Sequence, residues 1–515
     1  MTYEVSEKTA KSDSWRTLSK PTIGKDILEL LSSSMYIDPL TIYREYIQNA
    51  ADSIDEARSQ GLYGQGSDGK VKIHLDLNSR SIRIQDNGIG VRKENFESQL
   101  GTFGGSLKRG TSNRGFRGVG RLAGLGYCQS LIFRTRAAGE SLVSEMLWDC
   151  RKIKQLLQAT ESQWSLEDLL SQVVTIRHIG DDEFPTHFFE VEMCGVIRHK
   201  SDVLLNHRTI YDFLSEVAPV PFHPDFSFGP DILSELEDVS VGDVSIEIEG
   251  EPLPVYRPFR DSIEINDQRY DHYRNIEIHK LPALDDGTAA MVWFLHHSYK
   301  GSIPDKRLRG VRVRCGNIQI GDSDLFLDSF AEPRFNSWTV GEVHVLDLRL
   351  VPNGRRDHFE MGVHFDNLAN QITPLLRNIS SRCRKSSATR NRLRELSTLE
   401  ANVLDKLNAV INSPIDKRSR YLFLNQAEAS IVRMRSNLAS GNFDESAESE
   451  WTLRIDTLES KFAAARSVRK INDPLESFSA MKRNAYERVF GLILECSENQ
   501  EAARKLIDRI VAELN

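Results

Sequence analysis

The strongest pattern of apolar and polar positions lies between residues 41 and 58. Apolar side chains recur there three or four residues apart, which is the spacing of one face of an α-helix. Glu45, Asn49 and Asp52 fall together on the opposite face. Such a polar stripe is usual on a solvated helix surface, but a carboxylate beside a carboxamide can also face a ligand cleft. The pattern predicts an amphipathic helix and leaves both interpretations of its polar stripe open.

A pair of strands and a turn downstream favour the cleft. Residues 71–77 and 81–85 alternate between apolar and polar side chains, as the two faces of a strand do. The second segment runs into Asp86-Asn87-Gly88-Ile89-Gly90, where two glycines let the backbone come close to a ligand. Together, the polar helix stripe and this strand end suggest a nucleotide pocket.

Residues 101–126 form a glycine-rich stretch, in which nine glycines are interspersed with lysine and arginine. This composition predicts a basic loop that runs into a helix. Its segment Gly115-Phe116-Arg117-Gly118-Val119-Gly120 has a spacing that lets backbone N–H groups face phosphate oxygens. Glycine strings of this kind also occur in plain turns, so the segment alone identifies no ligand.

The remaining pattern divides the chain into regions of different character. Residues 1–20 are polar and aperiodic, which predicts an arm without fixed structure. Strand-like segments dominate the middle of the chain, at residues 244–248, 276–281, 290–296, 311–320 and 341–350. From residue 372 onward, helical periodicity dominates. The expected fold class is therefore α+β, with a mixed middle region and a helical C-terminal region.

Length and composition limit the number of domains and the cellular compartment that can be expected. A chain of 515 residues is too long for one hydrophobic core, so several domains are expected. The formal net charge of -8 gives no overall attraction to nucleic acid. Six cysteines without a CxxC pair favour reduced thiols in a cytosolic protein. Because no apolar run approaches the roughly 20 residues of a membrane span and no apolar signal core stands at the N-terminus, we expect a cytoplasmic protein without membrane contact.

Two basic segments are candidates for nucleic-acid binding. Four arginines lie between residues 307 and 314, and residues 377–394 carry seven basic side chains and no acidic one. Clustered lysine and arginine can contact phosphate groups. A solvated surface, or pairing with the acidic stretch at residues 231–251, is the favoured interpretation. Nucleic acid therefore remains a partner that the sequence does not favour.

The order of these segments resembles that of one ATPase superfamily. An ExxxNxxD helix, a DxGxG strand end and a glycine-rich lid ending in GxxGxG follow one another as in the GHKL ATPases, which share the Bergerat fold. The helix segment REYIQNAADS is most similar to that of the HtpG-type heat-shock protein 90 chaperones. Residues 186–191 stand where the family has Gly-Thr and an alternating strand, with Pro185 in place of the glycine. The resemblance covers roughly residues 22–195.

The resemblance implies a division into domains. An N-terminal arm of residues 1–20 would precede a GHKL ATPase domain of residues 21–196, a Bergerat-type α/β sandwich with its lid at residues 101–126. An α+β middle domain of residues 197–371 would follow. Residues 372–515 would form a helical domain for dimerisation or partner binding.

The resemblance also implies a role for each polar side chain of the pocket. Glu45 would be the general base that deprotonates the attacking water, and Asn49 would bind Mg²⁺ through its amide oxygen. Asp86 would accept a hydrogen bond from the adenine amino group, assisted by Thr186, and Asp52 would brace the pocket. The other nucleotide contacts implied are Gly88, Gly90, Ser106, Lys108, Gly115, Gly118, Val119 and Gly120.

A loop in the middle region resembles the loop that completes the site in these chaperones. Residues 351–357, VPNGRRD, are similar to the chaperones' Asn-x-Ser-Arg-Glu loop, and Arg356 aligns with its catalytic arginine. A guanidinium stabilises the charge on a transferring phosphoryl group. Arg355 is adjacent, and paired arginines also form salt bridges with acidic neighbours such as Asp357 and Glu360. The sequence therefore does not fix which arginine reaches the phosphate.

The resemblance thus implies a Mg²⁺-dependent ATPase that binds ATP and ADP, forms a homodimeric clamp and acts on protein clients or a partner protein. The alternative is a nucleic-acid-linked clamp similar to the MutL, topoisomerase-type or MORC proteins, in bacterial defence against phage. Sensor histidine kinases share the pocket, but this sequence shows neither a membrane segment nor a phospho-acceptor helix before it. A non-catalytic binding module is disfavoured because Glu45 is retained.

Overall fold

The computed structural model describes residues 38–64, 68–102, 120–158, 165–180, 183–198, 201–236, 243–266, 269–441, 443–467 and 474–514. These residues form two compact units, one that ends at residue 379 and one made of residues 380 onward together with residues 299–301. Helices and strands are mixed in the first unit, and the described elements of the second are all helices. The predicted α+β class is confirmed.

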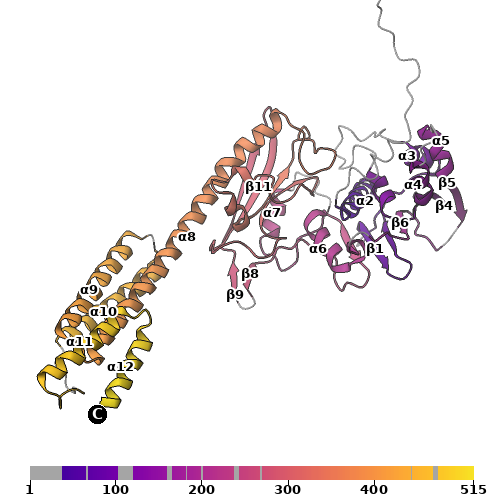
Figure 1. Cartoon of the computed structure of the whole chain (residues 1–515). Helices are drawn as coiled ribbons and strands as arrows, with labels where there is room; N and C mark the ends of the chain where they lie inside the picture. The colour runs from indigo at the N-terminus through magenta and orange to yellow at the C-terminus, as the bar shows by residue number, and fades with distance from the viewer. Residues whose placement is uncertain are drawn as a thin grey trace, which may run out of the picture. The chain divides into compact units, whose positions relative to one another are not determined.

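A seven-stranded sheet forms the N-terminal part of the first unit (Figure 1). Its strands, in the spatial order β5-β4-β3-β6-β2-β1-β7, are β1 (Lys70–Asp76), β2 (Ser81–Asp86), β3 (Ser130–Arg136), β4 (Leu142–Asp149), β5 (Val174–Gly180), β6 (Phe188–Cys194) and β7 (Ser245–Ile248). Neighbouring strands are antiparallel, except that β7 runs parallel to β1. Strand β7 lies within residues 197–371, the range expected for a separate middle domain. One strand of the N-terminal sheet therefore comes from that range.

Helix α2 (Thr41–Ser59) lies against one face of this sheet because its apolar stripe meets the apolar side chains of β1 and β2. Ile47 of the helix and Ile73 of β1 belong to one hydrophobic core. The polar stripe is shielded as well, since Glu45 is 7% exposed and Asp52 is 5% exposed. The interpretation of this stripe as a solvated surface is therefore wrong.

The shorter helical elements of this part are α3 (Lys93–Gly101), η1 (Gly120–Gly126), α4 (Cys150–Gln158), α5 (Leu166–Val173), η2 (Val203–Leu205) and α6 (His207–Val217).

The opposite face of the sheet carries polar side chains in a row that crosses all seven strands. The residues in register, from β5 to β7, are Arg177, Glu145, Arg134, Glu190, Gln85, Lys72 and Glu247. Arg134 pairs with Glu145 at 2.7 Å and with Glu190 at 2.8 Å. Opposite charges on neighbouring strands stabilise the sheet through such cross-strand pairs. The two faces of the sheet therefore differ, one apolar beneath α2 and one charged.

A five-stranded sheet forms the other part of the first unit. Its strands, in the spatial order β10-β11-β14-β12-β13, are β10 (Asn275–Pro282), β11 (Thr288–His296), β12 (Gly310–Cys315), β13 (Ile318–Ile320) and β14 (Val340–Val345). The single strand predicted at residues 311–320 is two antiparallel strands, joined by a turn at Gly316 and Asn317. The remaining elements are α7 (Gly229–Glu235), the hairpin of β8 (Ser262–Asn266) and β9 (Arg269–His272), η3 (Leu327–Ser329) and η4 (Pro333–Trp338).

The second unit is a bundle of helices. These are α8 (Val363–Asn412), which begins in the first unit, α9 (Lys417–Ser440), α10 (Glu445–Ser467), α11 (Ala480–Cys496) and α12 (Gln500–Leu514). Leu407, Phe423, Ile455 and Phe490 come from four different helices and share one buried core, as the helical periodicity from residue 372 predicts. Among the described residues, no helix combines the length and the apolar character that crossing a membrane requires.

Candidate active site

Two charged side chains from distant parts of the chain meet beside α2. The guanidinium Nε of Arg356 lies 3.7 Å from Oε1 of Glu45, and both side chains are largely buried. Arg44 approaches the same carboxylate oxygen with Nη2 at 3.3 Å and donates a hydrogen bond to the carbonyl oxygen of Arg355 at 3.1 Å. The side chain of Arg355 itself is exposed. Of the two arginines that the sequence left open, Arg356 is the one that faces Glu45.

The end of the glycine-rich stretch comes close to the same carboxylate. A Cβ atom at Gly120 would stand 2.5 Å from Oε2 of Glu45, so a larger residue would displace the carboxylate. The hydroxyl of Tyr46 accepts a hydrogen bond from the N–H of Gly124 at 3.0 Å and donates one to the carbonyl of Arg121 at 3.2 Å. These contacts fix η1 against α2 at the position of Glu45.

The other residues implied for the phosphate-binding lid lie outside the described residues. They are Ser106, Lys108, Gly115, Gly118 and Val119. Their contacts with phosphate stay predictions.

Asn49 follows Glu45 by one helical turn and is half-buried, so its amide lies on the same stripe of α2. In the part of the chain that the structure describes, no group of three or more His, Cys, Asp or Glu side chains is placed to hold a metal ion. In the arrangement that the resemblance implies, an ion at Asn49 would take its other ligands from phosphate oxygens and water. Mg²⁺ commonly binds in this way, with few protein ligands, so the residues present fit this ion.

Asp86 ends β2 with its carboxylate on the side of the sheet that α2 covers. Its Oδ1 accepts a hydrogen bond from the N–H of Gly88 at 2.9 Å, and the hydroxyl of Ser53 on α2 also bonds to the carboxylate. Burial raises the pKa of Asp86 to about 7, although both hydrogen bonds act to lower it. The two hydrogen bonds thus do not fully offset the cost of burying the charged carboxylate. A further hydrogen-bond donor, on a ligand, would stabilise the charged form.

Protein contacts account for both glycines of the DxGxG turn. A Cβ atom at Gly88 would overlap the side chain of Ser53, and one at Gly90 would overlap the carbonyl oxygen of Arg136. Gly90 also has a φ of +69°, which residues with a side chain rarely adopt. Close packing of the turn against α2 and β3 therefore requires glycine at both positions. The room for base and ribose that the resemblance implies at these glycines stays a prediction.

Residues that the sequence did not single out hold the same turn. Nδ1 of His187 lies 2.7 Å from the carbonyl oxygen of Gly88, and the hydroxyl of Tyr63 donates to the carbonyl of Asn87 at 3.1 Å. Burial, and then the nearby Asp86 charge, raises the pKa of Tyr63 to about 12. Tyr63 belongs to no recognisable motif, and His187 lies within residues 186–191 but has no role of its own in the resemblance, so only the fold reveals that both hold this turn.

Thr186 lies at the rim of this cluster. Its side chain is exposed, and it precedes β6, which begins at Phe188. The carbonyl of Pro185, which replaces the usual glycine, accepts a hydrogen bond from Nε of Arg136 at 3.0 Å. The structure therefore brings Asp86 and His187 together around the turn, but it leaves the Thr186 side chain outside the buried cluster.

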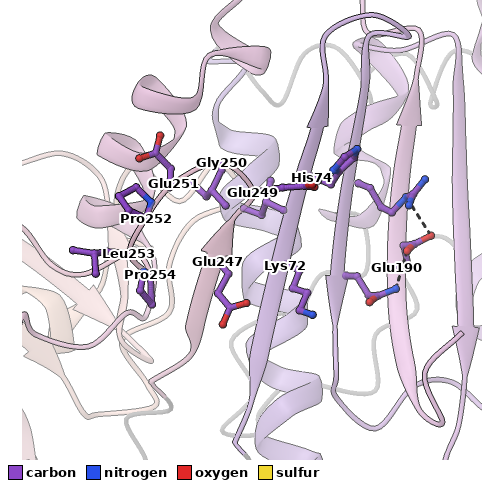
Figure 2. Close-up of a pocket in the computed structure, with 14 residues that line it drawn as sticks. Lys72, His74, Glu190, Glu247, Glu249, Gly250, Glu251, Pro252, Leu253 and Pro254 are labelled. Atoms are coloured by element: carbon purple, nitrogen blue, oxygen red, sulfur yellow. Dashed lines mark hydrogen bonds and ion pairs between the residues drawn. The ribbon is translucent and has the colours of Figure 1, made fainter.

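A separate hollow of about 630 Å³ opens on the charged face of the sheet. Figure 2 shows side chains of β1, including Lys72 and His74, opposite Glu247 and Glu249, with the segment from Gly250 to Pro254 beside them. Lys72 and His74 alternate along β1 with the buried Val71 and Ile73, which face α2. The sheet therefore separates this hollow from Glu45 and Asp86, and the hollow is no part of the candidate active site.

Two of the four arginines at residues 307–314 do not lie on a basic surface. Arg312 and Arg314 are buried, and their guanidinium groups pair with Glu216 at 3.2 Å and with Glu342 at 2.6 Å. Their surroundings contradict the solvated surface that the sequence favoured, and neither acidic partner lies within residues 231–251. Nucleic-acid binding therefore has no support from these two side chains.

Comparisons with known proteins agree with the geometry of the N-terminal part. Residues 41–180 match the family of histidine kinase-, DNA gyrase B- and HSP90-like ATPases. A protein named Chaperone protein HtpG from Shewanella pealeana is 29% identical over 181 residues, which are 31% of this chain and 27% of that protein. The protein of the same name from Chromobacterium violaceum is 27% identical over 208 residues, which are 36% of this chain and 31% of that protein. The chain thus spans less than a third of the length of these relatives.

The family match covers the helix with Glu45 and the turn with Asp86. Residues 41–180 carry a GHKL-type ATPase domain, as the resemblance implied. The chain is similar to the HtpG chaperones at modest identity over about a third of its length.

Proposed function

We propose that the chain is a cytoplasmic, Mg²⁺-dependent ATPase that hydrolyses ATP to ADP and phosphate and thereby opens and closes a homodimeric clamp on protein clients. The observation that carries this proposal is the approach of Arg356 to Glu45 beside Gly120. Transfer of a terminal phosphoryl group to water needs a base, a cationic group and backbone donors at one place. The name of the HtpG relatives supports the chaperone part of the proposal.

In this mechanism Glu45 orients the attacking water and accepts its proton. Arg44 and Arg356 contact this carboxylate. A triphosphate offers Arg356 a second anion, and its guanidinium then stabilises the charge that develops on the γ-phosphoryl oxygens. Because Glu45 and Arg356 are 311 positions apart in sequence, the site is complete only while two distant parts of the chain stay together. A ligand that contacts both parts favours that closed state over the open one.

Asp86 and Asn49 would hold the two ends of the nucleotide. The buried carboxylate of Asp86 would accept a hydrogen bond from the adenine amino group, which gains strength where water is excluded. Asn49 is the residue that would hold Mg²⁺, and the bound ion would neutralise charge on the phosphate oxygens. The described polar groups of α2 and β2 thus serve opposite ends of one ligand.

The first test is release of phosphate from ATP by the full-length chain, with and without Mg²⁺. We expect turnover that depends on the ion and rises when unfolded protein is added. If purified protein binds ATP but releases no phosphate under any of these conditions, the hydrolytic part of the proposal is wrong.

Arg356→Ala should lower the rate of ATP turnover about a hundredfold, because one preorganised donor to the transition state is lost. Arg355→Ala is the matched control, since its exposed side chain does not face Glu45, and we expect less than a twofold change. Steady-state turnover and ATP affinity measured for both variants decide between the adjacent arginines. Equal effects of the two substitutions would contradict the assignment of Arg356.

One observation favours the alternative of a nucleic-acid-linked clamp in defence against phage. Helix α8 carries the basic run at residues 377–394, and Arg377, Arg384, Lys385 and Arg394 are exposed on it. If this run binds phosphate groups, DNA should raise the ATPase rate, and the effect should fall steeply with salt. Turnover measured with DNA between low and physiological salt tests this alternative. Stimulation by unfolded protein without a response to DNA would rule it out.

A further inference from the structure

A cluster of buried charges joins the five-stranded sheet to the segment that follows α6. Glu342 of β14 accepts a hydrogen bond from Nη1 of Arg257 at 2.7 Å and one from Nε of Arg314 at 2.6 Å. All three side chains are at most 2% exposed. Buried charges are tolerated only where each has a partner, and removing one partner leaves the others unpaired. We call Arg257, Arg314 and Glu342 the arginine joint.

The arginine joint is bonded to the main chain next to the ATPase part. Arg257 Nε donates to the carbonyl of Val220 at 3.0 Å. Arg314 donates to the carbonyl of Glu216 at 2.7 Å and to that of Ala218 at 3.3 Å. Because these carbonyl groups are spaced along one segment, the joint holds that segment at several points rather than at one.

Asn317 connects the arginine joint to the far end of α2. It stands between β12 and β13 with a φ of 64°, and its Oδ1 accepts a hydrogen bond from Arg257. Its Nδ2 donates to Oδ1 of Asp243 at 2.6 Å. The carbonyl of Asp243 in turn accepts a hydrogen bond from Arg58, in the last turn of α2, at 2.7 Å. The start of β13 is thus tied to the C-terminal end of the helix that carries Glu45.

The other end of β13 is tied to the loop that carries Arg356. Gly321, directly after the strand, donates from its N–H to the carbonyl of Arg356 at 2.8 Å. A Cβ atom at Gly321 would stand 2.7 Å from the carbonyl oxygen of Asp357, so the loop rests closely on the strand end. Arg356 then reaches Glu45, near the N-terminal end of α2. The contacts form a closed ring that leads from Arg58 in the last turn of α2 through Asp243, Asn317, β13 and Arg356 to Glu45 near the start of the helix.

We propose that Asn317 and Asp243 are positioning residues for ATP hydrolysis, because they anchor β13 as a strut that holds Arg356 at the correct distance from Glu45. This inference rests on the proposed ATPase function. A rate that depends on an arginine near the transferring phosphoryl group is sensitive to displacements of about 1 Å. The Arg356 loop is also held by contacts among its own residues, such as the hydrogen bond from Asn353 Nδ2 to Asp357 at 2.6 Å, and by the hydrogen bond from Arg44 of α2 to the carbonyl of Arg355. The strut therefore adds a second link between the loop and α2 that does not pass through Glu45, and it reaches the opposite end of the helix from Arg44.

Asn317→Gly is the most direct test, because glycine keeps the positive φ and removes both side-chain hydrogen bonds. We expect turnover to fall about tenfold while ATP affinity changes less than twofold. Asn78→Gly, at an exposed turn between β1 and β2, is the matched control and should leave both unchanged. A parallel loss of ATP affinity and turnover in Asn317→Gly would point to general destabilisation and overturn the proposal.

A second pair of variants tests the proposal without a substitution at position 317, in case Asn317→Gly does not fold. Asp243→Ala removes the acceptor for Asn317, whereas Asp243→Asn keeps an oxygen there. The alanine variant should slow turnover as Asn317→Gly does, and the asparagine variant should restore it. Equal turnover of the two Asp243 variants would overturn the proposal.

The combination with Arg356→Ala separates the strut from the ATPase assignment itself. If Asn317 acts through Arg356, adding Asn317→Gly to Arg356→Ala causes no further loss of turnover. Additive losses would mean that Asn317 acts elsewhere, and the strut would be wrong while the ATPase proposal stands. If the unmodified chain hydrolyses no ATP, both proposals fail.

Discussion

Glu45→Ala is expected to reduce ATP turnover about a thousandfold while ATP binding persists, because the substitution removes the general base and leaves the adenine contact in place. Glu45 is the side chain on which Arg44, Arg356 and the backbone at Gly120 converge. No other carboxylate on the described face of α2 stands in that position, since Asp52 lies two turns further along the helix. Loss of the carboxylate should therefore stop the chemical step rather than the recognition of the nucleotide.

The measurement combines phosphate release with an independent titration of ATP binding. Glu56→Ala is a matched control, because Glu56 lies on the same helix and is exposed. Glu45→Gln should behave like the alanine variant and keeps an oxygen acceptor beside Arg44 and Arg356. Turnover within tenfold of the unmodified chain in both Glu45 variants would remove Glu45 from the role of base.

Local patterns predicted the part of the site that lies within a short stretch of sequence. Helix α2 and strands β1 and β2 follow the predicted segments closely, because each buries one face against the other and so keeps a regular apolar spacing. The Asp86 turn is equally local, since the glycines stand within four residues of the carboxylate. Burial of Glu45 and Asp52 follows less directly, because helix periodicity alone does not tell a cleft from a solvated surface.

Long-range contacts could not be predicted from the spacing of residues. The alternation at residues 244–248 correctly indicates a strand, but nothing local shows that β7 pairs with β1. The arginines at positions 312 and 314 look like a surface cluster in sequence, yet they are buried because Glu216 and Glu342 come from other elements. His187 holds the carbonyl of Gly88 across 99 positions. In each case the missing information is which distant residue supplies the partner.

Asp86→Asn should have opposite effects on nucleotide binding and on stability. ATP affinity should fall about a hundredfold, because a carboxamide would place a donor where the adenine amino group needs an acceptor. Isothermal titration with ATP measures this loss, and Asp231→Asn, at an exposed position on α7, is the matched control. Tight ATP binding by Asp86→Asn would contradict the adenine-binding role.

The same substitution should make the nucleotide-free protein more stable above neutral pH. Burial raises the pKa of Asp86 to about 7, well above the value near 3.9 of an unfolded aspartate. The folded protein therefore binds more protons than the unfolded chain between these values, and its free energy of unfolding falls as the pH rises from about 4 to about 7. Asparagine removes this penalty, which amounts to at most about 4 kcal/mol. Thermal unfolding should thus show a higher midpoint for Asp86→Asn at pH 8 and a shrinking difference toward pH 4. A variant that is more stable at pH 8 but fails to bind ATP would show that the loss of binding does not come from unfolding, as expected for a ligand-binding group.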